Sequence, residues 1–267
     1  MSFEKCDFLS KTQIEKYLKG KAKKVSLQIY DTVGSTNDIV KQEALQGAEE
    51  GLTVIALHQT DGRGSKGRSF FSPAYSGIYM SILLKPDLSE KVGLITSLAG
   101  VCVCEATKKL SDKNAKIKWV NDIFIDNKKV CGILTEGVYS KDNTFAYAVL
   151  GIGINVYSPK DSFPDELKDI AGAVFERETP DTKNKLVAEI LNLFFEKYHE
   201  FSKKEICRQY KEKSLVIGKE ITFTEQEKTS RALALDIDEN CGLVVKLKNG
   251  QIKTLTSGQI SIRKEKL

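Results

Sequence analysis

The sequence predicts an α+β protein of two parts, a larger first domain over residues 1–213 and a small all-β domain over residues 214–267. Apolar residues recur at helical spacing in some segments of the first part and alternate at strand spacing in others. After about residue 214 the helical spacing stops, and four or five short alternating segments follow, separated by turn-forming pairs. The second part is therefore expected to form a small β-barrel or curled sheet.

The first domain is expected to begin with a helix, a strand and a second helix. Residues 9–20 have helical spacing, and residues 25–33 alternate as a strand does. The next helix is predicted to start at Ser35, which can cap it, with Asp38 completing an approximate capping box. The residues expected at this helix N-terminus are Ser35, Thr36 and Asn37.

Strands and helices are then expected to alternate along the rest of this domain. β-Branched and apolar residues bounded by turn formers predict strands over 52–60, 77–86, both sides of the turn Asp126-Asn127-Lys128, and 145–156. Helical spacing predicts helices over roughly 89–110, 181–199 and 202–212, with Pro180 just before or at the first turn of the second. In the last part, turns are expected at Glu239-Asn240 and Asn249-Gly250.

Composition and charge exclude several classes of protein. The chain of 267 residues is 41% hydrophobic and 29% charged, as ordinary globular proteins are. It has no run of about 18 apolar residues and no apolar leader, so we expect a cytoplasmic protein that does not enter a membrane. Six cysteines without a C-x-x-C pair and only two histidines predict reduced, mostly structural thiols and no zinc site. The net charge of +5 suits phosphorylated ligands or an acidic partner.

The segment "QTDGRGSKGRSF", residues 59–70, contains two incomplete nucleotide-binding fingerprints. Gly62, Gly64 and Gly67 spell G-x-G-x-x-G, and Arg68 stands where a P-loop would have lysine. Both fingerprints need a helix directly after the glycines to hold the phosphate, and the following residues predict none. We therefore interpret the segment as a mobile basic loop that becomes ordered around an anion, the alternative being a flexible surface loop. Its basic residues are Arg63, Lys66 and Arg68.

Five further segments accompany this loop in a fixed order. They are Ser35-Thr36-Asn37, Lys118 to Asp122, Lys129 to Glu136, Gly151-Ile152-Gly153-Ile154-Asn155, and Ile260-Ser261-Ile262-Arg263. The set resembles the biotin protein ligase family, whose pattern is S-T-N, Q-x-x-G-R-G-R-x-G-R-x-W, K-W-P-N-D, Lys before a small residue and G-I-L-x-E, G-x-G-x-N, and I-S-x-R. The order and approximate spacing hold from about residue 30 to the end of the sequence.

The resemblance implies a mixed β-sheet with helices on one face, of the class II synthetase type, followed by an SH3-like β-barrel. It implies an enzyme that uses biotin, ATP and Mg²⁺ to form biotinyl-5′-adenylate. The biotinyl group then passes to a lysine of a biotin carboxyl carrier domain. The enzyme would be a monomer or a homodimer.

Cations are needed where the biotin carboxylate approaches the α-phosphate, because two unit charges about 4 Å apart repel by about 4 kcal/mol at an effective dielectric near 20. Arg63 and Arg68 can form forked hydrogen bonds to such oxygens. The resemblance places Lys129 against the carboxylate and the α-phosphate, the alternative being a solvated hairpin lysine. Asp122 is the expected Mg²⁺ contact, and it is also a candidate to assist the acceptor lysine.

The neutral ureido ring of biotin calls for neutral hydrogen-bonding groups, which Ser35, Thr36, Asn37 and Gln59 supply. Asn121 is a candidate for ribose or phosphate contacts, and Trp119 either stacks on adenine or fills the core. Arg263 either reaches back to the nucleotide or lies on the surface. The remaining candidates for ligand contact are Gly62, Gly64, Ser65, Gly132, Gly151, Gly153 and Asn155.

Three positions depart from the family pattern. Ser65 replaces an arginine, which predicts looser retention of the adenylate. Val120 replaces proline, and Phe70 replaces tryptophan. About 25 residues precede the first predicted strand, too few for a helix-turn-helix domain, so a DNA-binding repressor is not expected.

Three other functions compete with this interpretation. A lipoate or octanoate ligase would need an apolar acyl tunnel, against which the polar Ser-Thr-Asn-Gln set argues. A nucleic-acid-binding barrel would need aromatic stacking platforms, yet residues 214–267 contain only Phe223. A biotin-binding regulator without activity would not need Lys129, Arg63 and Arg68.

Overall fold

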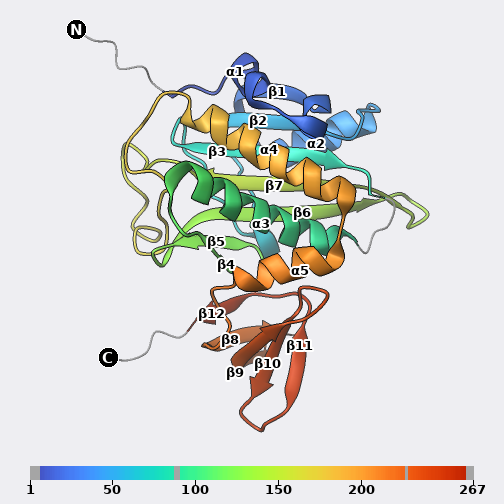
Figure 1. Ribbon diagram of the computed structural model, residues 1–267, viewed down its shortest axis with the longest axis vertical. Coiled ribbons are helices and arrows are strands. Elements are labelled where there is room, and N and C mark those ends of the chain that lie inside the picture. The colour runs from blue at the N-terminus through green and yellow to red at the C-terminus, as the bar shows by residue number, and fades with distance from the viewer. Residues whose placement is uncertain (1–6, 87–90, 226–227, 263–267) are drawn as a thin grey trace.

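The computed structural model describes residues 7–86, 91–225 and 228–262, which form two β-sheets and five α-helices (Figure 1). The strands of the first sheet are β1 (Ser26–Val33), β2 (Leu52–Gln59), β3 (Gly77–Leu84), β4 (Lys116–Lys118), β5 (Asp122–Ile125), β6 (Lys128–Tyr139) and β7 (Phe145–Asn155). Their order in space is β1-β2-β3-β7-β6-β5-β4. Only β1 and β2 pair in parallel among these described strands, so the sheet is mixed, as predicted.

The helices begin and end close to the predicted positions. They are α1 (Lys11–Tyr17), α2 (Thr36–Leu45), α3 (Lys91–Ser111), α4 (Thr182–Glu200) and α5 (Lys203–Glu212), with short 3₁₀ helices at Gly20–Lys24 and Ser65–Gly67. The predicted start of the third helix at residue 89 lies outside the described residues. No helix in the described ranges is both long and apolar enough to cross a membrane.

The two faces of the first sheet are covered by different helices. Side chains alternate across a strand, and Ile55 of β2 joins the core formed with α3 and α4. Its neighbour Val54 packs with Val149 of β7 and Val40 of α2 instead. Figure 1 shows α3 and α4 crossing one face. The predicted helical layer is thus confirmed, and α2 covers part of the opposite face.

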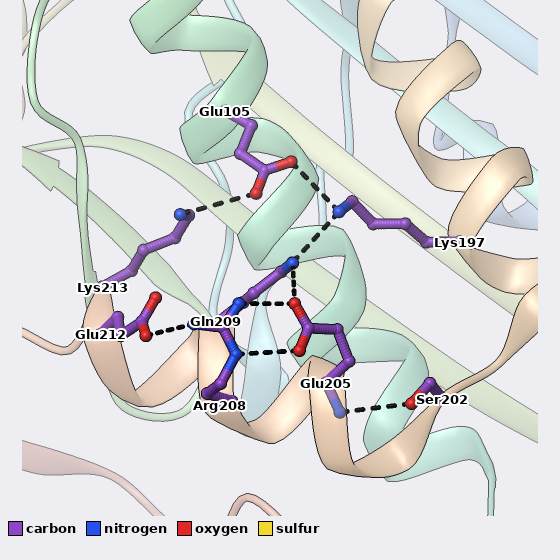
Figure 2. Close-up of polar contacts among 8 residues, drawn as sticks. All are labelled: Glu105, Lys197, Ser202, Glu205, Arg208, Gln209, Glu212 and Lys213. Atoms are coloured by element: carbon purple, nitrogen blue, oxygen red, sulfur yellow. Dashed lines mark hydrogen bonds and ion pairs between the residues drawn. The ribbon is translucent and has the colours of Figure 1, made fainter.

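Helix α5 is fastened to α3 and α4 by a network of charged and amide side chains (Figure 2). Glu105 of α3 forms ion pairs with Lys197 of α4 at 3.5 Å and with Lys213, just after α5, at 3.6 Å. Lys197 also donates to Gln209 of α5 at 3.1 Å. These contacts set the position of α5, and with it the point where the chain leaves for the second sheet.

The second sheet is small and entirely antiparallel. Its strands are β8 (Glu220–Glu225), β9 (Lys228–Ile237), β10 (Leu243–Leu247), β11 (Ile252–Leu255) and β12 (Ile260–Ile262), in the order β11-β10-β9-β8-β12. The predicted turns lie between β9 and β10 and between β10 and β11. The expected all-β second part is confirmed, whereas its boundary at residues 213 and 214 stays a prediction.

The segment 118–122 is tied to both α5 and the second sheet. Tyr210 of α5 donates its hydroxyl to the Val120 carbonyl at 2.9 Å, and the Trp119 indole donates to the Cys241 carbonyl at 3.0 Å. The peptide bond between Trp119 and Val120 is cis. These bonds hold the segment that begins one wall of the site described next.

Candidate active site

A cavity of about 390 Å³ opens on the α2 side of the first sheet. It is bounded by the N-terminus of α2, the loop 59–70, strands β3, β5, β6 and β7, and residues at the start of β12. The predicted site residues that line it are Ser35, Thr36, Asn37, Gln59, Arg63, Gly64, Ser65, Arg68, Asn121, Asp122, Lys129, Gly132, Gly151 and Gly153. The fold thus brings to one place segments that lie far apart in the sequence.

One wall of the cavity consists of neutral hydrogen-bonding groups. Thr36 and Asn37, at the start of α2, are almost completely buried. Gln59, at the end of β2, accepts the backbone N–H of Thr36 at 2.9 Å. Gly151 of β7 gives Asn37 its room, since a Cβ there would lie 2.5 Å from the Asn37 Oδ1 atom.

A second part of the cavity wall is cationic. Lys129 Nζ lies 2.5 Å from Asp122 Oδ1, and both side chains are mostly buried. Lys118 and Arg68 also line this part of the cavity. Burial lowers the pKa of Lys118; the charge of Asp122 opposes the shift, while Lys129 and Arg68 add to it. A polyanion placed here would meet several positive charges within one small volume.

The basic loop is folded back on itself. The Phe70 N–H donates to the Gly62 carbonyl and the Gly64 N–H to the Arg68 carbonyl, both at 2.7 Å. The next element after the loop is strand β3, so the predicted absence of a phosphate-binding helix is confirmed. A Cβ on Gly62 would collide with the Phe70 carbonyl oxygen, so the loop can close in this way only with glycine at this position. Gly62 does not line the cavity.

The two arginines of the loop have partners within the protein. Arg63 forms an ion pair with Asp38 of α2 at 2.6 Å. Ser35 precedes α2 but makes no capping hydrogen bond through its side chain, so the predicted capping box is wrong. The reason is that the Asp38 carboxylate turns to Arg63. Arg68 donates to the carbonyl and the hydroxyl of Ser65 at 3.2 and 3.0 Å.

Phe70 lies over the strand glycines. A Cβ on Gly153 would come within 2.5 Å of the Phe70 ring, and one on Gly132 within 3.1 Å. Lys129 Nζ lies 5.9 Å from the centre of the same ring. The glycines of β6 and β7 therefore make room for an aromatic side chain that forms part of the cavity wall.

Three predicted residues have other surroundings or lie outside the described residues. Trp119 is 3% exposed and packs in the core, so the structure favours the core alternative over stacking on adenine. Asn155 does not line the cavity; its amide donates to the Gly172 carbonyl at 3.0 Å and holds that loop. Arg263 lies outside the described residues.

Several lining residues were not among the predicted site residues. They are Ser69, Phe70, Tyr79, Met80, Lys118, Phe124, Ile133, Leu134, Ile152, Leu167, Ile170, Gln259 and Ser261. Lys118 begins the K-W-V-N-D segment and could have been included on that basis. Leu167 and Ile170 come from a loop whose sequence carries no such motif, and only the fold brings them here.

The donor set does not fit a metal ion held by the protein alone. Asp122 is the one carboxylate among the described lining residues, and it already pairs with Lys129. The described residues contain no group of three or more His, Cys, Asp or Glu side chains suited to a metal. The role of Asp122 as a Mg²⁺ ligand therefore stays a prediction.

Comparisons with known proteins agree with this geometry. Residues 30–155 match the Biotin/lipoate A/B protein ligase family, and residues 216–263 match the Biotin protein ligase C terminal domain. The chain is 33% identical to the bifunctional ligase/repressor BirA of Bacillus spizizenii over 95% of this chain and 79% of that protein. It is 28% identical to the biotin–[acetyl-CoA-carboxylase] ligase of Mycobacterium tuberculosis over 73% of each.

A solved structure shows the same architecture. The biotin protein ligase of Aquifex aeolicus in complex with biotin and ATP superposes with a TM-score of 0.76 at 29% identity, covering 90% of this chain and 99% of that one. Together with the sequence matches, this similarity shows that the chain belongs to the biotin protein ligase family.

Proposed function

We propose that the protein is an ATP-dependent biotin protein ligase that joins biotin to AMP and then transfers the biotinyl group to a lysine of a biotin carboxyl carrier domain. The observation that carries the proposal is a single cavity with one neutral polar wall and one cationic wall. Biotin has a neutral ureido ring at one end and a carboxylate at the other, and ATP adds the polyanion. The division of the cavity suits the two ends of the first substrate and the phosphates of the second.

In the first step the biotin carboxylate oxygen attacks the α-phosphorus of ATP, and pyrophosphate leaves. Lys129 and Arg68 offset the repulsion between carboxylate and phosphate and stabilise the charge that develops in the transition state. Arg63 would leave Asp38 for the phosphates, because a surface ion pair is a weak contact that a polyanion can replace.

In the second step the ε-amine of the acceptor lysine attacks the acyl carbon, the carbon–oxygen bond to AMP breaks, and an amide forms. The attacking lysine has to lose its proton. Asp122 is the carboxylate of the described cavity wall and is our candidate to accept it. Within the described residues the cavity wall holds no cysteine or histidine that suggests a covalent acyl-enzyme.

The proposal is tested by incubating the protein with biotin, MgATP and a biotin carboxyl carrier domain and probing the product with labelled streptavidin. We expect label on the carrier domain that depends on ATP and on the acceptor lysine. Absence of label with active, folded protein would contradict the proposal. Transfer of lipoate or octanoate instead would support a lipoate ligase, and biotin binding without transfer would support a regulator.

The two-domain boundary, the cytoplasmic location and the monomeric or homodimeric state stay predictions.

A further inference from the structure

We infer that Ser81 and Glu136 are positioning residues for substrate recognition. They set the direction of a buried hydrogen-bond chain so that Thr36 and Gln59 present two acceptors to an N–H group of the substrate. The inference rests on the proposed function, in which that substrate is biotin. It explains why a ring without an N–H group, such as the dithiolane of lipoate, would be rejected.

Glu136 determines the orientation of Asn37 at one end of the chain. Its carboxylate accepts from Asn37 Nδ2 at 2.6 Å and from Lys41 Nζ at 2.8 Å. Burial raises the pKa of Glu136, but the hydrogen bonds from Lys41 and Asn37 outweigh it and hold the pKa below the usual value. An ionised carboxylate only accepts, so the Asn37 amide nitrogen faces Glu136 and its oxygen faces Ser81.

A backbone N–H group determines the orientation of Gln59 at the other end. The Thr36 N–H donates to Gln59 Oε1 at 2.9 Å, which requires the amide oxygen at that position. Gln59 Nε2 then donates to Ser72 at 3.0 Å. The chain is therefore closed at both ends by amide oxygens that can only accept.

The hydroxyl groups of Ser81 and Thr36 lie between these two amide oxygens. They take part in three oxygen–oxygen contacts but carry only two protons. The contacts are Ser81 Oγ to Asn37 Oδ1 at 2.5 Å, Thr36 Oγ1 to Ser81 Oγ at 2.7 Å, and Thr36 Oγ1 to Gln59 Oε1 at 3.1 Å. Two oxygens without a proton between them repel more strongly the closer they lie. The two protons therefore occupy the two short contacts, and the contact at 3.1 Å is left with two acceptors facing each other.

These two acceptors lie where a substrate can reach them. Thr36 and Gln59 both line the cavity, whereas Ser81 is fully buried and does not. An N–H group of a ureido ring can donate to both oxygens at once. A ligand without such a donor would leave both unpaired, and sites built around a hydrogen bond reject ligands that lack it.

The test measures binding of biotin and of two cyclic carbamate analogues, each with one ureido N–H replaced by oxygen, by calorimetry. The quantity compared is the ratio of the dissociation constant of the weaker-binding analogue to that of biotin. We expect this ratio to be at least about tenfold in the unaltered protein. In Ser81→Ala the Thr36 proton is free to donate to Gln59, and we expect this ratio to fall to about threefold or less. At saturating biotin, ATP–pyrophosphate exchange should keep its kcat within about twofold while the KM for biotin rises.

Three further variants separate positioning from a structural effect. Glu136→Gln, at a partly exposed position, removes the accept-only partner of Asn37, and we expect it to lower the ratio as well. Lys41→Met leaves the carboxylate and its hydrogen bond from Asn37 in place. The ratio should therefore keep its original value, measured at a pH high enough that Glu136 stays ionised without Lys41. In a Thr36→Val background, Ser81→Ala should weaken biotin binding no further.

Failure of this inference can be distinguished from failure of the proposed function. An unchanged ratio in folded Ser81→Ala would overturn the inference while leaving biotin ligation intact. If Ser81→Ala does not fold, an unchanged ratio in Glu136→Gln overturns it instead. Absence of biotin binding by the unaltered protein would contradict the proposed function itself, and the inference with it.

Discussion

Lys129 of β6 lies 2.5 Å from Asp122 of β5, so the lysine of this hairpin is held by a carboxylate from the adjacent strand. This ion pair directs the ammonium group into the cavity. Lys129 is therefore not the solvated hairpin lysine of the alternative interpretation. We expect Lys129→Ala to lower the rate of ATP–pyrophosphate exchange by about 10²–10³-fold, because it removes a cation from the developing charge. Lys128→Ala is the matched control, since Lys128 does not line the cavity. Equal losses in both variants would argue against the role of Lys129.

We expect Asp38 to compete with ATP for Arg63. Both side chains of this ion pair are more than a third exposed, so the pair adds at most about 1 kcal/mol to stability. We expect Asp38→Ala to melt near the original temperature and to bind ATP more tightly, most clearly at low salt. Asp61→Ala serves as control because its carboxylate lies 3.9 Å from Arg63 and is largely exposed. Weaker ATP binding in Asp38→Ala would show that the ion pair organises the loop for the substrate instead.

Lys118 should make ATP binding sensitive to pH. Burial lowers its pKa from 10.5, so it loses its proton at a lower pH than an exposed lysine. Bound phosphates favour the charged form, and binding therefore takes up a proton. ATP affinity should fall as the pH rises through the lowered pKa. Calorimetry in buffers of different ionisation enthalpy measures the proton uptake, and Lys118→Arg should reduce it because arginine stays protonated.

The same shift has the opposite sign for folding. The unfolded chain binds more protons than the native protein between the lowered pKa of Lys118 and 10.5, so the penalty that this group places on the folded state shrinks as the pH rises across that window. Urea unfolding with and without Lys118→Met measures the effect. The free energy of unfolding of the unaltered protein minus that of Lys118→Met should rise with pH across this window, and a fall would contradict the sign.

Trp119 is expected to matter for stability more than for ATP. Its indole N–H is the donor to the buried Cys241 carbonyl, and Trp119→Phe would leave that carbonyl unpaired at a cost of about 1–3 kcal/mol. The KM for ATP should change by less than about twofold, because the ring does not line the cavity. Tyr139→Phe, at an exposed aromatic, controls for the denaturation measurement. A large rise in the KM for ATP would restore the alternative of adenine stacking.

Ser65 is expected to affect retention of the adenylate. Its hydroxyl and carbonyl accept from Arg68, at the position where the family pattern has a further arginine. We expect Ser65→Arg to slow release of biotinyl-adenylate severalfold, since it adds a charge beside the phosphate. Ser65→Ala, which removes the hydroxyl without adding charge, is the control. Equal release rates in Ser65→Arg and the unaltered protein would contradict the hypothesis.

Local features of the sequence predicted most element boundaries closely. The helix predicted over 181–199 spans Thr182–Glu200, and the strand predicted over 52–60 spans Leu52–Gln59. Hydrophobic periodicity depends on neighbouring residues only, which is why it can be read without a fold. The capping box failed because the partner of Asp38 is Arg63, 25 residues away in the sequence.

The site residues also divide into features that the local sequence shows and features that depend on contacts between distant residues. The motifs alone assembled most of the polar residues that line the cavity, because the type and spacing of those residues are visible in the chain. The sequence by itself determined the two-part fold, the neutral and cationic residue sets, and the resemblance to one family. Only the tertiary structure decided that Trp119 fills the core, that Gly153 makes room for Phe70, and that Ser81 connects Thr36 to Asn37. Each of these depends on contacts between residues distant in sequence, and packing and hydrogen-bond partners of that kind exist only once the chain has folded.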